Sequence, residues 1–545
     1  MKKYIILSLT VLAAAVIPGC DKFLDHVPDN RTEINTEEKV ISLLTSAYPE
    51  NTYIVLTELS SDNVDDYIVS FTASDRFYDQ IFAWEDITED DNDSPEQLWN
   101  ASYASIAAAN HALQAIEELG GAKNQAMREA RAEALLCRAY NHFILTNIFC
   151  LPYNTATSDT DPGIPYALEP ETTLKPDYQR GTVAQDYALI KADLLEALEN
   201  VGDRNYSVPK YHFNARAAYA FAARFFLYYE KWEEAVYWAN KCLGSEAKSM
   251  LRDWAYMGEL SSTDPEVIWN DYIKTDANTN LLLMAPYSAV GVVFGPYSAC
   301  TRYSHGAYLS STETYEGYNI WGNGEYKLKI ATYIGALDRV IQWKLPYKFE
   351  YTDPVAGIGY IHTVYPAFWA DECLLNRAEA YIMLGRYDEA AADLSLWITN
   401  IAQNGGTYSA TDIAKYYASI PYTDFSGRTA DEWVWTGKKH LHPGFDIGAE
   451  GERKESMLQA VLSMRRIETI GQGIRWFDIR RYGIEVARRR MNSAGGVLRV
   501  ENNILTKDDG RRALQLPLKV ISAGLPRNDR GNTPVTGTDK ENTEE

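Results

Sequence analysis

A helix–turn–helix pattern that occurs twice constrains the fold more than any other feature of this 545-residue sequence. The later copy is formed by Ala378, Tyr381, Gly385, Tyr387 and Ala390. The earlier copy has the same spacing, at Ala223, Phe226, Glu230, Trp232 and Ala235. These are the offsets of a tetratricopeptide repeat, in which small residues let two helices approach closely and aromatic side chains fill the turn between them. The sequence therefore predicts pairs of helices separated by insertions.

Further long amphipathic helices are predicted in the first part of the chain. Residues 94–97, Ser-Pro-Glu-Gln, have the form of a capping box with Pro at the first helical position. Trp99, Tyr103 and Ile106 follow at steps of four and three, and a Gly pair at 120–121 ends the run. Two more helices are expected over about 126–149 and about 183–198.

The predicted fold class is all-α, with tetratricopeptide-like helical pairs forming a scaffold that carries a loop-rich, variable face. We expect a single domain over 20–545, with helical scaffold at about 36–260 and 365–490. Between these parts, about 261–364, lies an irregular, aromatic-rich insertion without a sustained helical period. Residues 527–545 are polar and contain Gly and Pro, which predicts a frayed tail.

The first twenty residues have the features of an export signal. Lys2 and Lys3 precede a 13-residue apolar run at 5–17, which is shorter than the ~20 residues of a membrane-spanning helix. The run ends in Ile-Pro-Gly-Cys, which resembles a bacterial lipoprotein box. We therefore predict a lipoprotein signal peptide at 1–19 and lipid attachment at Cys20, with a plain secretory signal as the alternative. Two or three acyl chains anchor a protein stably without spanning the membrane.

Composition limits the partners that the chain can bind. The 75 acidic residues outnumber the 52 basic ones and give a net charge of −23, which argues against nucleic-acid binding. The 38 Tyr and 13 Trp are unusually many. Most of these rings will be core, but aromatic-rich irregular segments, such as 285–326, suit a surface that stacks against a flat polar ligand.

The sequence predicts no catalytic residues, no cofactor and no metal site. It has no G-x-S-x-G, no phosphate loop, no H-E-x-x-H and no G-x-G-x-x-G after a strand. The acidic run 85–93 lacks the Gly and Glu spacing of an EF-hand and is typical of a solvated loop. Carboxylate pairs for glycoside hydrolysis are defined in space rather than in sequence, so a surface glycoside hydrolase stays open as an alternative.

An arginine-rich segment, residues 465–490, contains eight Arg and only three acidic residues. The acidic net charge and the predicted export of the chain argue against nucleic-acid binding by this segment. The interpretation favoured here is that the guanidinium groups pair with carboxylates and stack on aromatic rings, which locks the segment to the helical core.

Several of these segments together resemble the SusD/RagB family of Bacteroidetes outer-membrane nutrient-binding lipoproteins. The two most specific are DECLLNRAEA at 371–380 and IRWFDIRRYG at 474–483. The CDKFLD start at 20–25 and the W-x-x-x-Y-x-x-I-x-x-x-N helix from Trp99 to Asn110 also match. The segment at 467–473, IETIGQG, departs from the charged, Glu-rich run that is usual in the family.

The resemblance implies a non-catalytic lipoprotein that is anchored by lipid in the outer membrane and lies on the cell surface. Such a protein binds an oligosaccharide or another nutrient and caps a TonB-dependent, SusC-like transporter. A helical-repeat scaffold without a small-molecule ligand is the remaining alternative.

Ligand binding is expected at aromatic loops near the start of the Trp99 helix and in the central irregular segment. The predicted stacking rings are Trp99, Tyr297 and Trp321, and the predicted polar partners are Asp75, Arg76 and Asn100. Five of them have a structural alternative: Trp99 shares a helix face with Tyr103 and could be core, Tyr297 and Trp321 could pack a loop lid, and Asp75 and Arg76 could form a local ion pair.

Overall fold

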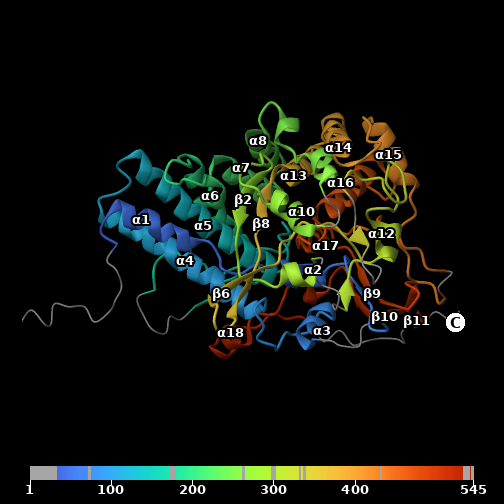
Figure 1. The fold of residues 1–545 in the computed structure, drawn as a ribbon, viewed down its shortest axis with the longest axis horizontal. Coiled ribbons are helices and arrows are strands. Elements are labelled where there is room, and N and C mark those ends of the chain that lie inside the picture. The colour runs from blue at the N-terminus through green and yellow to red at the C-terminus, as the bar shows by residue number, and fades with distance from the viewer. Residues whose placement is uncertain are drawn as a thin grey trace, which may run out of the picture.

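Helices are the main secondary structure of the fold, and they pack side by side across the upper part of the molecule (Figure 1). The computed structural model describes residues 34–70, 75–171, 178–260, 264–295, 302–330, 333–334, 339–429, 432–531 and 540–541, with the backbone alone at 333–334 and 540–541. Within these residues, no helix is both long enough and apolar enough to cross a membrane.

The first group of helices comprises α4 (Pro95–Glu118), α5 (Gln125–Phe149) and α6 (Val183–Leu198), each packed against the next. α4 begins where the sequence predicts, because the Ser94 hydroxyl accepts a hydrogen bond from the Gln97 backbone N–H at 3.3 Å. α1 (Glu37–Leu43) and the short 3₁₀ helix η2 (Leu44–Ala47) pack on α4. The predicted helices of this region are thus confirmed to within a residue at their ends.

The second group contains the two predicted helix–turn–helix segments. α7 (Ala215–Tyr228) packs on α8 (Trp232–Leu243), and α13 (Ala370–Met383) packs on α14 (Tyr387–Ile401). The two turns use the same device, a residue in the left-handed region: Glu230 at φ 59° and Gly385 at φ 73°. α13 also contacts α8 and α16 (Arg453–Thr469), and α16 pairs with α15 (Ala410–Ser419). The helix pairs lie where predicted.

The all-α prediction is wrong in one respect, because short strands join distant parts of the chain. β9 (Val486–Met491) pairs antiparallel with β10 (Val497–Leu505) and parallel with β1 (Asp65–Asp66). The same five-stranded sheet contains β3 (Tyr303–Ser304) and β11 (Lys540–Glu541) at its edges. The end of the arginine-rich segment is therefore a strand, which pairs with the nearby β10 and, through Arg490, with Asp66 more than 400 positions away.

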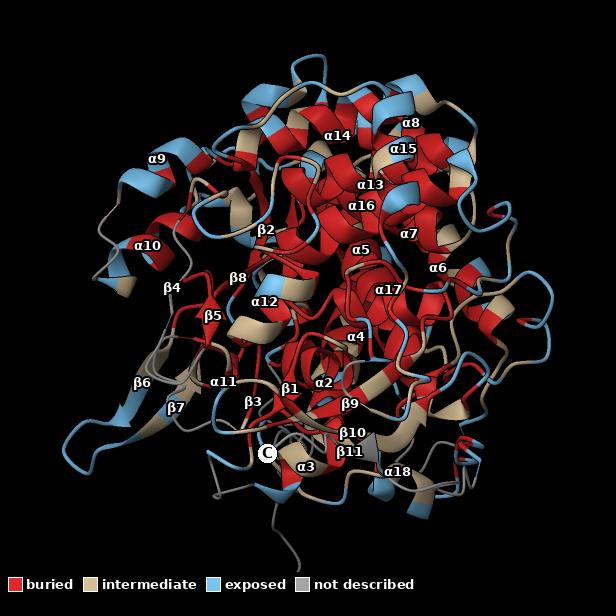
Figure 2. Ribbon diagram, turned by 90° about the vertical axis from the view of Figure 1, so that its right-hand side faces the viewer, coloured by how far each residue is buried: buried red, intermediate tan, exposed pale blue. Residues whose placement is uncertain are grey.

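The remaining strands lie in the region predicted to be irregular. They are β2 (Asn280–Met284), β4 (Tyr333–Ile334), β5 (Val340–Ile341), β6 (Lys348–Asp353), β7 (Ile358–His362) and β8 (Tyr365–Trp369). β2 and β8 form a buried pair, and β8 continues directly into α13. β6 and β7 form a hairpin that projects from the molecule (Figure 2).

Short helices complete the structure. They are α2 (Ile54–Ser60), α3 (Arg76–Phe82), α9 (Trp254–Glu259), α10 (Pro265–Tyr272), α11 (Val290–Val293), α12 (Ala307–Glu313), α17 (Arg475–Arg481) and α18 (Leu518–Ser522), with 3₁₀ turns η3 (Pro209–Tyr211), η4 (Ala247–Met250) and η6 (Gly510–Arg512). The chain is still packed at 528–530, where Asn528 and Arg530 are buried, so the predicted tail does not begin at residue 527.

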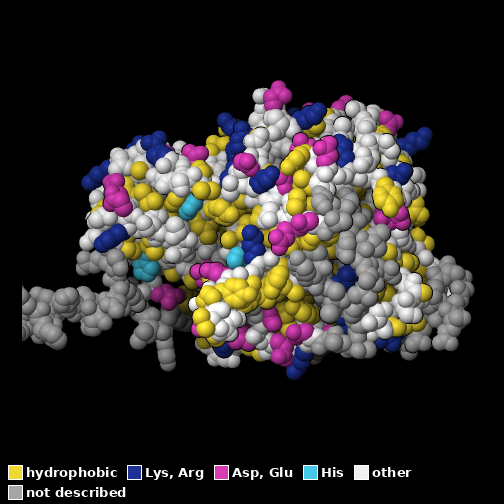
Figure 3. All heavy atoms as spheres, viewed as in Figure 1, with side chains coloured by type: hydrophobic (Ala, Val, Ile, Leu, Met, Phe, Trp, Pro, Cys, Tyr) yellow, Lys and Arg dark blue, Asp and Glu magenta, His cyan; other side chains and the backbone are white. Residues whose placement is uncertain are grey.

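Most aromatic side chains belong to the core, which runs through the helix pairs (Figure 2). The Phe221 ring contacts the rings of Phe143 and Tyr140 edge to face, at centroid distances of 5.5 and 5.8 Å. A few apolar side chains are exposed instead. On the β6–β7 hairpin they are Tyr351, Val355, Ile358 and Tyr360, and Figure 3 shows hydrophobic side chains gathered in this part of the surface.

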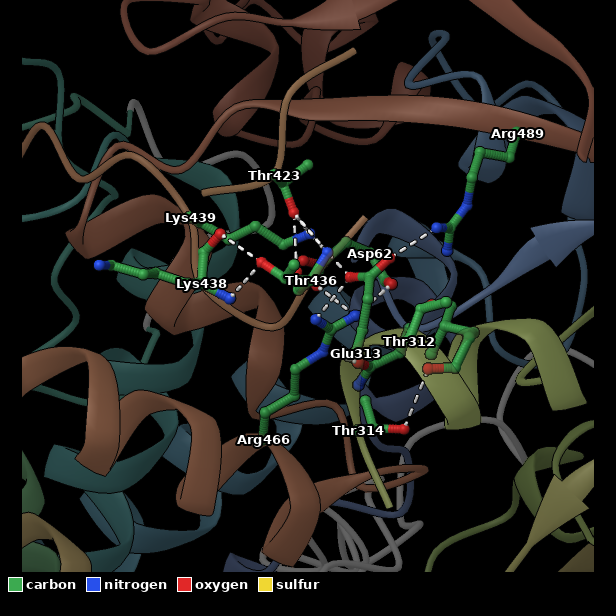
Figure 4. A network of polar contacts seen from close by, with 12 residues as sticks. Asp62, Thr312, Glu313, Thr314, Thr423, Thr436, Lys438, Lys439, Arg466 and Arg489 are labelled. Atoms are coloured by element: carbon green, nitrogen blue, oxygen red, sulfur yellow. Dashed lines mark hydrogen bonds and ion pairs between the residues drawn. The ribbon is translucent and has the colours of Figure 1, made fainter. Parts of the chain in front are cut away.

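The arginine-rich segment is locked to the core by buried ion pairs, as the sequence predicts. The Glu313 carboxylate on α12 accepts from Lys439 Nζ at 2.7 Å, Arg466 Nη1 at 2.9 Å and Arg489 Nη1 at 2.6 Å (Figure 4). Burial alone would raise the pKa of Glu313, but Lys439, Arg489 and Arg466 hold that pKa well below its usual range. Arg489 also lies 4.4 Å from the centroid of the Trp435 ring. The segment therefore pairs and stacks as expected.

Candidate ligand-binding site

A pocket lies between the first turns of α4 and the short helix α18. Its volume is about 340 Å³, within the range of small-molecule sites. Its lining residues come from three distant parts of the chain: Trp99, Asn100, Tyr103, Pro165, Glu171, Tyr178, Val520, Ala523, Gly524 and Leu525.

The α4 side of the pocket is an aromatic wall. The Trp99 ring lies 4.9 Å from the Tyr103 ring and 5.2 Å from the Phe149 ring, centroid to centroid. Tyr103 donates its hydroxyl hydrogen to the Pro165 carbonyl at 2.6 Å, and burial raises the pKa of this phenol well above its usual value. The wall is thus rigid, because packing and a hydrogen bond fix its rings.

The opposite wall is formed by residues 520–525, which comprise the end of α18 and the turn after it. Lys519 on α18 pairs with Glu96 on α4 at 2.5 Å. Arg180 donates to the Pro526 carbonyl at 3.0 Å and to the Gly163 carbonyl at 2.6 Å. Gly524, at φ 114°, turns the chain in a conformation that favours glycine. These contacts hold the C-terminal segment against the start of α4.

Polar groups at the mouth of the pocket could orient a ligand. Asn100 and Glu171 are exposed, and the Tyr178 side chain is 38% exposed. An amide, a carboxylate and a phenol at the rim of an aromatic pocket can hydrogen-bond hydroxyl groups while a ring face contacts C–H groups. The arrangement suits a neutral, polyhydroxylated molecule.

A buried carboxyl group fixes the loop that leads into α4. Asp93 accepts from the Ser288 hydroxyl at 2.5 Å and from the Ala289 backbone N–H at 2.8 Å. Burial raises the pKa of Asp93 to about 7, against the lowering effect of these two hydrogen bonds. The central segment of the chain is thereby tied to the start of the helix that carries Trp99.

Of the predicted ligand residues that the structure describes, Trp99 and Asn100 are the two that line this pocket. Trp99 is 7% exposed, so it both packs in the core and lines the pocket. Asp75 caps α3 by accepting from the Phe77 backbone N–H at 2.9 Å, and Arg76 pairs with Glu89 at 3.3 Å rather than with Asp75. Neither Asp75 nor Arg76 is among the described residues that line the pocket.

The other predicted positions do not contribute a described ring to the pocket. Trp321 is 5% exposed and packs edge to face on Trp397, at a centroid distance of 5.7 Å. Trp321 is a core residue, because the irregular segment folds back on α14. The prediction that Trp321 is an open stacking ring is therefore corrected. Tyr297 and Cys20 lie outside the described residues.

Sequence reasoning missed Tyr178, Glu171 and the 520–525 segment. Tyr178 lies just after the Pro-rich connection at 161–176, between the helices predicted at 126–149 and 183–198. That connection is the one local signal for a loop at this position. The 520–525 segment gave no signal, since it reaches α4 only through tertiary packing. Within the described residues, no group of three or more His, Cys, Asp or Glu side chains is placed to hold a metal ion.

Comparison with known proteins agrees with this architecture. A family model described as "Starch-binding associating with outer membrane" matches residues 22–227, and the SusD family model matches residues 345–516. Together the two matches cover more than half of the chain. No curated protein matches it significantly.

Solved structures share the fold at low sequence identity. A SusD superfamily protein from Bacteroides fragilis has a TM-score of 0.61 and 18% identity, over 93% of this chain and all of its own. One from Bacteroides thetaiotaomicron has a TM-score of 0.59 and 16% identity, over 90% of this chain and 98% of its own. A SusD-like carbohydrate-binding protein from Bacteroides vulgatus has a TM-score of 0.57 and 15% identity, over 89% of this chain and 95% of its own.

The chain thus shares its overall fold with these solved SusD superfamily structures. The chain belongs to the SusD/RagB family.

Proposed function

We propose that this protein binds a neutral oligosaccharide in the pocket between α4 and α18, without catalysing a reaction on it. The observation that carries the proposal is the aromatic wall of Trp99 and Tyr103 in a pocket that the exposed Tyr178 and the amide-bearing Asn100 also line. A sugar ring can place its C–H face on an aromatic side chain while its hydroxyl groups bond to the rim. The family description and the carbohydrate-binding relative support the same ligand class.

The charge distribution favours a neutral glycan over an acidic one. The chain carries a net charge of −23, and Glu171 at the rim is exposed. A uronic-acid polymer would be repelled by both. Of the described residues that line the pocket, Glu171 alone carries a carboxylate, whereas glycoside hydrolysis uses a pair of them. This supports binding without hydrolysis.

Binding is tested by isothermal titration calorimetry with the neutral oligosaccharides maltoheptaose, xylohexaose and mannohexaose. Oligogalacturonate serves as the acidic comparison. We expect at least one neutral oligosaccharide to bind the wild-type protein. Tyr178→Ala should weaken it about 10- to 30-fold, the loss typical of removing an aromatic anchor. The matched control is Tyr351→Ala, which removes an exposed tyrosine on the β6–β7 hairpin. Equal effects of the two substitutions, or preference for oligogalacturonate, would refute this site.

We further propose that the mature chain is a single domain in which tetratricopeptide-like helix pairs serve as a scaffold, held at the outer-membrane surface by lipid on Cys20. There it would deliver its ligand to a TonB-dependent, SusC-like transporter. Support comes from the lipoprotein-like sequence at 17–20 and from the family's description as associating with the outer membrane. Cys20→Ala should move the protein from the membrane fraction to the soluble fraction. Affinity purification of the wild-type protein from detergent-solubilised membranes should recover the transporter.

A further inference from the structure

We propose that the chain carries a second site for a neutral oligosaccharide, in a pocket beside α9 that is separate from the α4 site. The inference rests on the proposed function, because it assigns the same class of ligand to a second place. The pocket has a volume of about 530 Å³ and lies between α9, the loop after α10 and the C-terminal end of α14. This volume is within the range of small-molecule sites.

The floor of this pocket is organised around one buried carboxylate. Asp371 accepts from the Thr279 hydroxyl at 2.6 Å and from the Arg252 backbone N–H at 3.1 Å. The Asn400 amide donates to the Arg252 carbonyl at 2.9 Å. Thr279, Arg252 and Asn400 all line the pocket, and the first two are almost completely buried. The floor is therefore formed before any ligand arrives, which lowers the entropic cost of binding.

The guanidinium group of Arg252 is already used by the protein. It lies 3.6 Å from the centroid of the Tyr272 ring and donates to the Tyr272 carbonyl and to Asn280 Oδ1, each at 2.8 Å. A guanidinium held in this way serves the fold and is not free to clamp a phosphate or carboxylate ligand with two parallel bonds. Among the described residues, the floor thus offers no dedicated anion site.

The rim combines an exposed ring with balanced charge. The Tyr256 side chain is 44% exposed, and Lys274 Nζ lies 5.6 Å from the centroid of its ring. Lys274 also pairs with Asp271. The charged lining residues are three basic and three acidic: Lys248, Arg252, Lys274, Asp253, Asp271 and Asp276. A net charge of zero, with an aromatic ring at the edge, fits a neutral polyhydroxylated ligand better than an anion or a cation.

The two pockets are separate places on the molecule. They share no lining residue. Figure 1 and Figure 2 both show α18 at the bottom of the molecule and α10 well above it. One polysaccharide chain that engages both sites would be held by avidity, since binding at one site raises the effective concentration at the other.

The test compares single variants on maltoheptaose, xylohexaose and mannohexaose. Tyr256→Ala should lower the number of oligosaccharides bound per protein from two to one, and Tyr178→Ala should leave the α9 site occupied. The matched control is Tyr237→Ala on α8. Tyr237 is 52% exposed and has Lys241 Nζ 5.6 Å from its ring centroid, but it lines neither pocket. It therefore removes an equivalent tyrosine and leaves both sites intact.

Hydrogen–deuterium exchange with the same oligosaccharides locates the site. We expect ligand to protect amides in 248–257 and 274–279 in the wild-type protein and in Tyr178→Ala, and this protection to disappear in Tyr256→Ala. If Tyr178→Ala abolishes all binding and these segments are never protected, the second site is refuted while the proposed function stands. If none of the oligosaccharides binds the wild-type protein, both are refuted.

Discussion

Replacing Glu313 by glutamine should destabilise the protein strongly. The Glu313 side chain is only 1% exposed, and its carboxylate is shared by Lys439, Arg466 and Arg489. Glutamine preserves the shape of the side chain but removes the negative charge. Among the described residues, Asp62 and Asp65 would then be the carboxylates that still pair with these cations, through Arg466 and Arg489.

The expected loss follows from these contacts. At an effective dielectric constant of about 20, a charge pair separated by about 2.7 Å gains roughly 6 kcal/mol of gross Coulomb energy. Desolvation and the remaining carboxylates offset most of this, and breaking a buried pair typically costs about 3–5 kcal/mol. The unfolding entropy is near 2.1 cal/mol/K per residue, and the chain has 545 residues. Dividing the expected loss of free energy by this entropy gives a melting temperature lower by about 3–4 °C.

The assay is urea unfolding of the wild type, Glu313→Gln and Glu389→Gln. Glu389 provides the matched control, because it pairs with Arg386 at 3.0 Å on an exposed surface, where an ion pair is worth about 0–1 kcal/mol. The folded-state pKa of Glu313 is depressed, so its contribution is present above the unfolded value of 4.5 and is lost as the pH falls. The Glu313→Gln deficit should therefore shrink below pH 4.5. A deficit no larger than that of Glu389→Gln at pH 7 would refute the reasoning.

Three further outcomes are expected. Burial raises the pKa of Asp93 from 3.8 to about 7, so between these pH values the folded state retains a proton that the unfolded state has lost. The free energy of unfolding of the wild type therefore falls as the pH rises through this range. Asp93→Asn lacks this titration, so its free energy of unfolding should rise relative to that of the wild type in urea titrations from pH 4 to 7.5. Burial lowers the pKa of His142 to about 3, so its ring resonances should not titrate between pH 5 and 8, and a midpoint near 6.5 would contradict its buried place. Phe221 is fully buried among aromatic rings, so Phe221→Ala should lower the free energy of unfolding by about 3–5 kcal/mol. The exposed-residue control, Tyr237→Ala, should change it by no more than about 0.5 kcal/mol.

Local signals account for what could be predicted of the fold. Ser94 and the spacing that follows it define the start of α4, and the small and aromatic residues around Gly385 define the α13–α14 turn. Capping and helical periodicity act over a few residues, so they can be read from neighbouring positions. The need of the arginines for buried partners was likewise evident, since burying a charged group is costly unless it is paired and hydrogen-bonded.

Which groups meet across the chain was decided by the tertiary structure alone. Nothing local pairs Arg466 with Asp62, 404 positions away, or sets Arg490 opposite Asp66 in a parallel strand pair.

The site shows the same division. Trp99 and Asn100 were found from the helix that carries them, whereas Tyr178 and Leu525 reach the pocket only because distant segments pack against α4. Trp321 was predicted to be open and is buried. An irregular segment has no periodicity that indicates which of its rings faces the core. The sequence by itself thus determined the helices and the chemical types of residue, since these depend on near neighbours. The tertiary structure decided which rings are buried and which form a pocket, because that depends on long-range packing.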